Sequence, residues 1–260
     1  MNKTVIITGS ASGIGKGIAE HFFQEGYQLL LVDINEEQLK SSKEEITKGD
    51  SSGRKVAYLA GDLTDNSFRE DIISFAEKEF SHLDVLINCA GIFPATPAFD
   101  ISEGEWDSVF NLNVKALFFL SIGFAKLAKN KGFQANIVNI TSAASEVARP
   151  GVTHYCSSKA AVKMMTQVLA LELAPFGIRV NAVGPGLVET ETLLKTLDNE
   201  KAQIEHKEKI SYSPLNRTAK ISEIAEVVSF VSSDKASYMT GQNILVDGGY
   251  SAGRVFKSFN

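Results

Sequence analysis

The chain has 260 residues, of which 44% are hydrophobic and 22% charged, and its formal net charge at pH 7 is −5. This composition excludes a disordered or fibrous chain, and the length favours one large α/β domain over two small ones. Lys and Arg form no cluster of the kind that a nucleic-acid surface requires, and two distant cysteines with four scattered histidines predict no metal site.

The N-terminal segment has too short an apolar run before Thr8 for a secretory signal. No stretch of about 18 uncharged apolar residues indicates a membrane span. We therefore expect a cytoplasmic protein without membrane contacts.

Short runs of β-branched and aliphatic residues recur along the chain, and each is continuous rather than alternating. A strand needs this pattern when helices cover both of its faces. The predicted strands are residues 4–8, 28–33, 55–60, 84–88, 136–140, 178–183 and 243–247. Because helical patterns separate these strands, the chain predicts a doubly wound, Rossmann-type parallel sheet of seven strands within a single α/β domain, residues 1–260.

The turn TGSASGIG follows the first predicted strand and opens a helix. Gly9, Gly13 and Gly15 permit a tight turn in which main-chain amides approach an anion, and a pyrophosphate is the expected ligand. The spacing is G-x-x-x-G-x-G, not the common G-x-G-x-x-G. Ser10 and Gly17 also depart from the pattern of a nucleoside-triphosphate loop.

Asp33 ends the second predicted strand, 18 residues after Gly15. A carboxylate at this place accepts hydrogen bonds from the ribose hydroxyls of adenosine and repels a 2′-phosphate. No Lys or Arg stands in the turn before Gly15 to offset that repulsion. We therefore expect NAD(H), in preference to NADP(H), as the cofactor.

Two amphipathic segments, 66–80 and 155–173, are typical of helices that cover the sheet, and Pro175 and Gly177 end the second. Within that second helix, Tyr155 and Lys159 lie one turn apart on the same face. A neighbouring ammonium is expected to lower the pKa of the phenol from about 10 toward the working pH, where it can donate and accept protons.

Residues 187–215 form a long, highly charged insertion before the last helix. Its composition is equally typical of a solvated helical hairpin and of a lid over a substrate. The lid is favoured because ligands of parallel sheets bind beyond the carboxyl ends of the strands, where this segment emerges.

These motifs together resemble the classical short-chain dehydrogenase/reductase family over nearly the whole chain. TGSASGIG matches the family's glycine turn, Asn88-Cys89-Ala90-Gly91 matches NNAG with one departure at Cys89, and Val246-Asp247-Gly248-Gly249 matches VDGG. Asn113 follows Trp106 by seven residues and Ser142 precedes Tyr155 by thirteen, as in the family. We expect the Cys89 departure to leave the glycine turn and active site intact and to loosen packing around the fourth strand.

The resemblance implies an oxidoreductase that interconverts a secondary alcohol and a ketone by hydride transfer with a nicotinamide cofactor. In it, Tyr155 moves the proton, Lys159 lowers the pKa of the phenol and holds the nicotinamide ribose, Ser142 binds the substrate oxygen, and Asn113 holds a relay water. Residues 1–140 mainly bind the dinucleotide, and residues 141–260 supply the catalytic and substrate side. The implied cofactor contacts are Gly9, Ser12, Gly13, Ile14, Gly15, Asp33, Asp62, Leu63, Asn88, Ala90, Gly91, Tyr155, Lys159, Pro185, Gly186, Val188 and Thr190.

For the substrate, the segment from Ser145 to Tyr155 resembles sugar and polyol dehydrogenases of the family, and Ser142, Glu146 and Tyr155 are the expected contacts. Arg149 and His154 are either further contacts or ordinary loop residues. A homotetramer, or a dimer, is expected from the family, with Val168, Leu169 and Leu173 facing either a partner subunit or the sheet.

Three other functions were weighed. The runner-up is a 3-oxoacyl-carrier-protein reductase. Asp33 disfavours it because those enzymes mostly use NADPH, and this chain has Leu171 where many of them carry an arginine for the acidic carrier protein. A methyltransferase would have no use for the Asn113, Ser142, Tyr155 and Lys159 set. A catalytically silent NAD-binding sensor or scaffold on the same fold remains the non-enzyme alternative.

Overall fold

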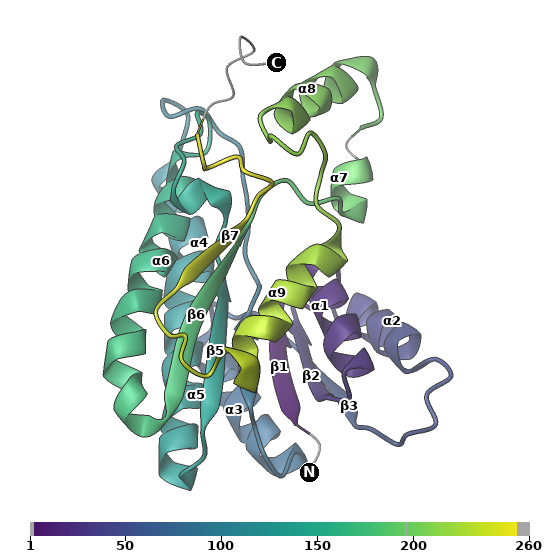
Figure 1. The fold of residues 1–260 in the computed structure, drawn as a ribbon, viewed down its shortest axis with the longest axis vertical. Coiled ribbons are helices and arrows are strands. Elements are labelled where there is room, and N and C mark those ends of the chain that lie inside the picture. The colour runs from purple at the N-terminus through teal and green to yellow at the C-terminus, as the bar shows by residue number, and fades with distance from the viewer. Residues whose placement is uncertain (1–2, 196, 254–260) are drawn as a thin grey trace.

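The computed structural model describes residues 3–195 and 197–253, so residue 196 of the predicted lid and the tail 254–260 lie outside the described part. Figure 1 shows a twisted sheet between layers of helices. The sheet has seven parallel strands in the order β3-β2-β1-β4-β5-β6-β7. This confirms the predicted doubly wound fold in a single domain.

The strands lie close to their predicted ranges, since six of the seven depart by no more than one residue at either end. They are β1 (Thr4–Thr8), β2 (Gln28–Asp33), β3 (Val56–Ala60), β4 (Val85–Asn88), β5 (Ala135–Ile140), β6 (Ile178–Pro185) and β7 (Asn243–Val246). Every residue of β1 and β4 is buried, as continuous apolar runs require. β6 runs two residues further than predicted, through Gly184 and Pro185, where it still pairs with β7.

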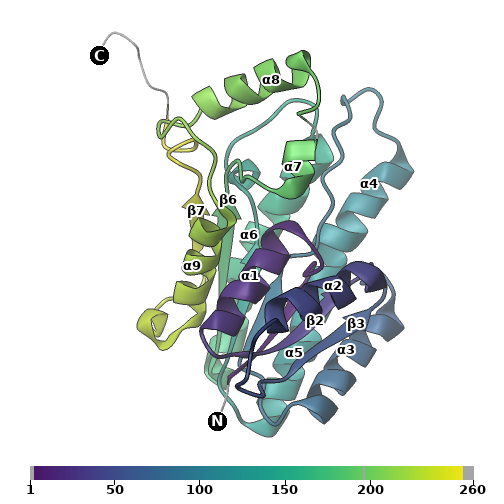
Figure 2. The ribbon, with the colours of Figure 1, turned by 90° about the vertical axis from the view of Figure 1, so that its right-hand side faces the viewer.

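Helices cover both faces of the sheet. They are α1 (Gly13–Gln24), α2 (Glu36–Thr47), α3 (Asn66–Glu79), α4 (Glu103–Phe110), α5 (Leu117–Lys131), α6 (Thr153–Leu173), α7 (Glu191–Lys195), α8 (Glu200–Ser211) and α9 (Ile221–Ser232). Side chains of α1, α2 and α9 pack in one core layer, and those of α3, α5 and α6 pack in the other. Figure 2 shows α1, α2 and α9 together on the side that faces the viewer.

The two helices predicted from amphipathic spacing begin and end near their expected residues. Asp65 caps α3 by accepting a hydrogen bond from the Ser67 amide. α6 begins at Thr153, two residues before Tyr155, and ends where Pro175 enters a short 3₁₀ turn. Gly177 closes that turn with a φ of 73°, in the left-handed region that glycine adopts without strain.

Helices α4 and α5 join through a π-helical turn, Asn111–Ala116, into one helix from Glu103 to Lys131. By length and composition alone this helix could cross a membrane, although Lys115 and Lys126 interrupt its apolar residues, so that it contains no run of about 18 uncharged apolar residues. Leu120 and Phe124 are buried in the core layer beside α3, and 44% of the apolar window is buried. Its apolar character is therefore that of a core helix against a sheet.

Candidate active site

The predicted site residues gather at the carboxyl ends of the parallel strands. The strand order reverses between β1 and β4, because β2 and β3 extend the sheet to one side of β1 and β4 to β7 extend it to the other. Such a switch point opens a crevice where dinucleotides bind in this architecture. The segments that leave the strands there begin at Gly9 after β1, Asp33 in β2, Asn88 in β4, Ser142 after β5 and Gly186 after β6.

The glycine turn between β1 and α1 is a cradle that side chains would fill. Gly9 has a φ of 67°, and a Cβ atom there would lie 2.8 Å from the Ala90 Cα atom. A Cβ atom on Gly15 would lie 2.0 Å from the Gly9 carbonyl oxygen. Ser12 precedes α1 without donating or accepting a side-chain capping bond. The bare turn and the amides of the first helical turn, which includes Ile14, fit the pyrophosphate of a dinucleotide.

Asp33 is fixed beside this turn. Its carboxylate accepts hydrogen bonds from the amides of Ala11, at 3.1 Å, and Asn35, at 3.1 Å. The next residue, Ile34, is 71% exposed and carries no charge. Lys40, the nearest cation along the chain, pairs with Glu36, and Lys16 in α1 pairs with Glu20 and Glu45. No described cation therefore neutralises the Asp33 carboxylate.

The predicted adenine-side residues lie beyond β3. Asp62 is exposed, and its carboxylate accepts a hydrogen bond from the Thr64 amide. Leu63 is 8% exposed and packs in the core layer of α3 and α5. These positions fit contacts at the adenine end of the crevice, because packing fixes Leu63 and the Asp62 side chain is exposed to solvent.

The NCAG segment after β4 is held by polar contacts despite the Cys89 departure. Asn88 donates to the Ser121 hydroxyl and to Asn139 Oδ1, both at 2.9 Å, and its own Oδ1 atom is buried without a described partner. The amides of Cys89 and Ala90 donate to the Thr8 hydroxyl. Burial raises the pKa of the Cys89 thiol to about 12. The thiol is therefore protonated and packs as a small apolar group against the core.

The predicted cofactor residues after β6 run beside the glycine turn. A Cβ atom on Gly13 would lie 3.9 Å from the Thr190 methyl carbon, and a Cβ atom on Gly186 would lie 2.7 Å from the Asp247 Cα atom. Val188 is 7% exposed and forms a parallel bridge with Ala219. The segment from Pro185 to Thr190 thus borders the crevice on the side opposite Asp33.

Tyr155 lies near the start of α6 and faces two groups from other segments. The Ser142 hydroxyl hydrogen-bonds the phenol, and the Phe93 ring packs edge-on against it with centroids 4.5 Å apart. Ser142 Oγ also accepts a hydrogen bond from the Ala144 amide. The phenol, the serine hydroxyl and the loop after β4 therefore meet at one point.

The pKa of Tyr155 is raised, contrary to the expectation from its spacing to Lys159. Burial of the phenol is the main cause, and the hydrogen bond from Ser142 and the charge of Arg149 oppose it. Removing a phenolate from water costs more here than its neighbours recover. The expected lowering is therefore wrong for the protein described without cofactor.

Lys159 is 5% exposed, and its Nζ atom donates to the Ile140 carbonyl oxygen at 2.8 Å. The same atom lies 5.7 Å from the centroid of the Tyr155 ring. Burial lowers the pKa of Lys159 to about 8. The ammonium is therefore charged at neutral pH but close to losing its proton.

Asn113 is fully buried in the π-helical turn, a distortion often found at functional sites. Its Oδ1 atom accepts from the Ile92 amide at 2.9 Å, and its Nδ2 atom donates to the Ile92 carbonyl and the Ser158 hydroxyl. A Cβ atom on Gly91 would come within 3.0 Å of Asn113 Oδ1 and 3.6 Å of Lys159 Nζ. The side chain of Asn113 therefore fixes the loop after β4 beside α6.

Two residues considered for substrate contact are engaged elsewhere. The Glu146 carboxylate pairs with Lys163 and accepts from Asn243 Nδ2. His154 is fully buried, and its Nε2 atom lies 2.8 Å from Glu105 Oε1. This pair joins α4 to the start of α6, so the buried His154 side chain links these two helices.

A cavity of about 430 Å³ opens beside Tyr155 and Ser142. Its walls come from the loop after β4, the segment between β5 and α6, the end of β6, and the turn after β7. The insertion supplies the remaining wall through Leu187, Lys209, Ile210, Tyr212, Ser213 and Leu215. Among described residues, no group of three His, Cys, Asp or Glu side chains is placed to hold a metal ion.

Comparison with known proteins agrees with this geometry. A family model described as enoyl-(acyl carrier protein) reductase matches residues 9–251. The chain belongs to the classical short-chain dehydrogenase/reductase family. Its members are oxidoreductases that bind a nicotinamide cofactor, and this chain is such an enzyme.

Three relatives of this short-chain dehydrogenase/reductase span nearly its whole length. It is 36% identical over 258 residues to an (S)-acetoin-forming diacetyl reductase of Staphylococcus epidermidis, covering 96% of this chain and 98% of that one. It is 36% identical over 252 residues to an NAD-dependent glycerol dehydrogenase of Listeria innocua, covering 96% and 94%. A crystal structure of a short-chain dehydrogenase from Bacillus anthracis superposes with a TM-score of 0.87 at 32% identity, covering 98% of both chains.

Two residues that line the cavity of this short-chain dehydrogenase/reductase, Phe93 and Tyr250, belong to none of the sequence motifs and were not predicted. Phe93 lies only two residues after the NCAG segment, and that proximity was the available signal. Tyr250 lies one residue after the VDGG motif and lines the same cavity.

Proposed function

We propose that the protein is an NAD(H)-dependent dehydrogenase that interconverts a secondary alcohol and a ketone. The observation that carries the proposal is that Tyr155 and Ser142 meet at the wall of the cavity beside the dinucleotide crevice, with Lys159 Nζ 5.7 Å from the centroid of the phenol ring. The bound cofactor would accept or donate the hydride at the substrate carbon.

Proton transfer falls to Tyr155. Its hydroxyl would donate a proton to the ketone oxygen during reduction and accept one from the alcohol during oxidation. The Ser142 hydroxyl, already bonded to that phenol, would donate a second hydrogen bond to the same substrate oxygen as negative charge develops on it. The raised pKa of the phenol keeps it protonated at neutral pH, which suits the reductive direction.

Lys159 would hold the nicotinamide ribose and keep a positive charge near the phenol while it gives up its proton. Because the amide of Asn113 is occupied by Ile92 and Ser158, a relay water at Asn113 would have to use its main-chain carbonyl. The π-helical turn can leave such a carbonyl without its usual helical partner.

The proposal of NAD over NADP depends on Asp33. A 2′-phosphate beside this carboxylate would meet like charge with no described cation to compensate, and Ile34 offers no hydrogen bond. The Listeria relative is named as NAD-dependent. Gly9, Ser12, Gly13, Ile14 and Gly15 would hold the pyrophosphate.

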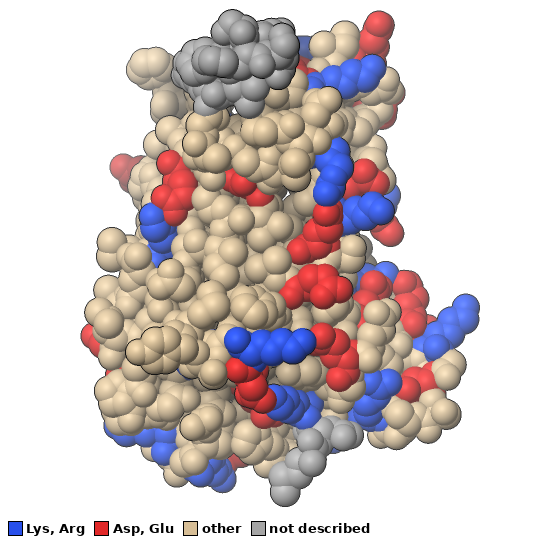
Figure 3. Space-filling view, in the orientation of Figure 1, with Lys and Arg blue, Asp and Glu red and all other residues tan. Residues whose placement is uncertain are grey.

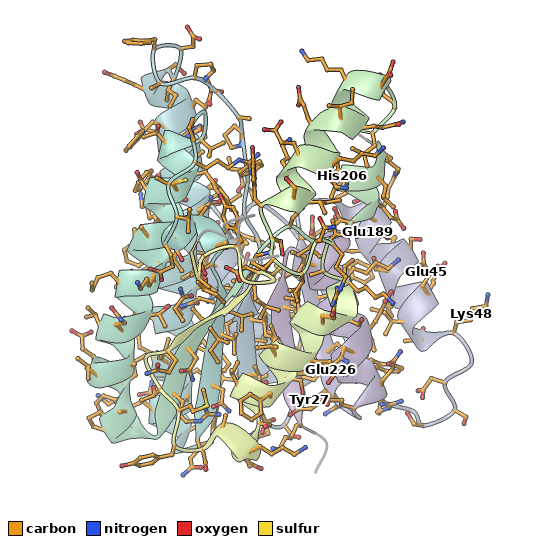
Figure 4. The ribbon with its side chains drawn as sticks, turned by 45° about the horizontal axis from the view of Figure 1, so that its top comes forward. Tyr27, Glu45, Lys48, Glu189, His206 and Glu226 are labelled. Carbon is orange, nitrogen blue, oxygen red and sulfur yellow. The ribbon has the colours of Figure 1, made fainter. Side chains whose placement is uncertain are left out.

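The insertion 187–215 is proposed as the substrate lid, since both of its ends are fixed and its middle is exposed. The amide of Glu189 donates to the Ala219 carbonyl, and the Leu215 amide donates to the Gly248 carbonyl. α8 has no buried residue, although its last residues line the cavity. Figure 4 shows Glu189 and His206 of this insertion on the same side of the molecule.

We place the enzyme in the cytoplasm as a homotetramer. Leu169 and Leu173 pack on the sheet, whereas Val168 is 45% exposed and shares its helix face with Met164 and Leu171. Figure 3 shows mostly neutral side chains over the α6 side of the molecule and mixed charges over the α9 side. A partner subunit would cover the apolar face of α6.

The second candidate is a 3-oxoacyl-(acyl-carrier-protein) reductase, because a relative that is 37% identical over 248 residues carries that name. It would use NADPH and bind an acidic carrier protein. Asp33 opposes the first requirement, and the exposed, uncharged Leu171 offers nothing to the second. A catalytically silent NAD-binding protein would leave the Tyr155, Ser142 and Lys159 set without a use.

The deciding experiment measures NADH consumption and formation with sugars, polyols, hydroxy acids, small diketones, steroids and acyl thioesters. Tyr155→Phe should still bind NADH, because the phenol oxygen is one of many expected cofactor contacts and the only group removed. Its turnover should fall by at least ~100-fold with every active substrate, the usual size of acid–base assistance. Turnover close to that of the wild type would remove Tyr155 from the proton-transfer role.

A further inference from the structure

Three described cations line the cavity, and two of them, Arg149 and Lys209, come from segments far apart in the chain. Arg149 lies between β5 and α6, and Lys209 lies near the end of α8. The Arg149 guanidinium sits over the Phe93 ring, 5.3 Å from its centroid, and Phe93 packs edge-on against Tyr155. Only one aromatic ring therefore separates Arg149 from the proton-transferring phenol.

Neither cation has a counter-charge within the described part of the chain. No hydrogen bond or ion pair joins Arg149 or Lys209 to a described residue, whereas Arg217 in the same lining pairs with Glu223 at 2.6 Å. The other acidic lining residue, Asp247, accepts hydrogen bonds from the amides of Gly249 and Ser251. The two carboxylates of the cavity are thus engaged, and two positive charges face it uncompensated.

The wall between these cations is largely apolar. Val147, Ala148 and Pro150 flank Arg149, while Ile210 and Leu215 flank Lys209. Apolar walls with a few convergent polar groups bind a hydrocarbon body and orient it by its polar end. Glu146, the residue expected to bind hydroxyls, is outside the lining and tied to Lys163.

We propose, on the basis of the proposed dehydrogenase function, that the substrate is a keto acid or hydroxy acid whose carboxylate is bound by Arg149, with Lys209 adding a second positive charge to the same cavity. Guanidinium and carboxylate match in a bidentate geometry, and the lysine adds a mobile point charge from the lid. The carboxylate would thereby draw α8 toward the body of the enzyme. Arg149 is the residue that selects an anionic substrate over a neutral one.

The test uses ketones that differ only in the charge at one end: 4-oxopentanoate against its methyl ester, and acetoacetate against methyl acetoacetate. KM and kcat are measured with NADH at pH 7 for the wild type, Arg149→Gln and Lys209→Gln. Lys207→Gln is the matched control, since Lys207 is exposed on α8 and outside the cavity lining. Two chain lengths allow for the distance between the reacting carbon and the cations.

The wild type should show a KM at least about tenfold lower for one of the acids than for its ester, the scale of one charge-assisted hydrogen bond in a partly exposed site. Arg149→Gln should reduce that acid-to-ester preference to within about twofold, Lys209→Gln should reduce it in part, and Lys207→Gln should preserve it. An ester preferred by the wild type, or a preference unchanged in Arg149→Gln, would overturn the proposal.

A binding measurement separates this inference from the function on which it rests. In the presence of NAD⁺, which cannot reduce a ketone, 4-oxopentanoate should raise the thermal midpoint of the wild type and not that of Arg149→Gln, and the ester should raise neither as much. If no ketone or alcohol is turned over, the proposed function fails. If esters are reduced but the acids neither bind nor react better, only the carboxylate assignment fails.

Discussion

Asp33 and Lys159 are the residues whose surroundings constrain the chemistry most. The first is a carboxylate at the end of β2 without a described cation beside it, and the second is an ammonium buried near the Tyr155 phenol. Two main-chain amides hold the Asp33 carboxylate, whereas burial makes the charge of Lys159 costly.

Replacing Asp33 should weaken the discrimination between NAD and NADP. Asp33→Ser removes both the ribose acceptor and the charge that repels a 2′-phosphate, so the NAD-to-NADP ratio of kcat/KM should fall by at least about tenfold. Asp33→Asn retains an acceptor for the Ala11 amide and separates loss of charge from loosening of the glycine turn. Steady-state kinetics with both cofactors measures the ratio, with Glu37→Ala as the control. An unchanged ratio would contradict the ribose assignment.

Lys159 should make the free energy of unfolding rise with pH in the alkaline range. Its pKa in the folded protein, about 8, lies below its usual value of 10.5, so between these values the unfolded chain holds a proton that the folded protein lacks. The cost of burying the charge is fully present below pH 8 and disappears as the pH rises past 10.5. This cost is at most about 3 kcal/mol.

Lys159→Met removes that cost. The difference in unfolding free energy between variant and wild type should therefore favour the variant most at pH 7 and shrink by pH 10. Denaturant unfolding of both proteins at the two pH values, without cofactor, gives the difference. A pH-independent difference would mean that Lys159 is not desolvated in solution.

At the scale of elements, the site depends on two segments that leave the neighbouring strands β4 and β5 and on the π-helical turn between α4 and α5. The loop after β4 brings Phe93 to Tyr155, the segment after β5 brings Ser142, and the π-helical turn brings Asn113 under that loop. The Glu105 and His154 pair fastens α4 to the start of α6, which carries Tyr155. Rigid elements therefore position the reacting groups, whereas the lid is the one wall with an exposed middle.

Removing the middle of the lid should spare the fold and impair substrate binding. α8 buries no residue, and the bonds of Leu187 and Glu189 to Ala219 hold the start of the insertion. Replacing residues 191–211 by a short Gly-Ser linker should leave the NADH affinity within about threefold, while kcat/KM should fall by at least about tenfold because water enters the cavity. Fluorescence titration and kinetics measure the two effects. A collapse of NADH binding would show instead that the insertion supports the crevice.

At the scale of the whole molecule, the surface of α6 is the feature that the core leaves unexplained. Met164, Val168 and Leu171 are 59%, 45% and 78% exposed and lie at intervals of four and three residues on one helix face. Apolar side chains grouped in this way are typical of a subunit interface.

A charge on this face should break the proposed assembly. Val168→Glu and Leu171→Asp should shift the sedimentation coefficient from that of a tetramer to that of a dimer or monomer. Phe99→Asp is the control, because Phe99 is fully exposed and belongs to the loop before α4. Sedimentation velocity at several protein concentrations measures the distribution. A wild type that remains monomeric throughout would refute the tetramer.

Much of the fold follows from local patterns. The strands could be predicted because each is a continuous apolar run, which a strand covered by helices on both faces requires, as in the buried Val5, Ile6 and Ile7 of β1. The edge strands β3 and β7 keep this pattern although they are only partly buried. The glycine turn and Asp33 could be placed at one edge because all carboxyl ends of parallel strands meet there. A Cβ atom at Gly9 or Gly15 would collide with main-chain atoms, and a glycine at each position of the sequence is a direct sign of that constraint.

Only the tertiary structure decided the sign of the pKa shift of Tyr155 and the lining of the cavity. The spacing from Tyr155 to Lys159 places two groups on one helix face, but desolvation depends on everything packed around them, including Phe93 from a distant loop. Likewise Glu146 and Arg149 are three residues apart, yet one is tied to Lys163 and the other faces the cavity. Burial and pairing are sums over neighbours that are remote in the chain, so they become defined only when the chain has folded.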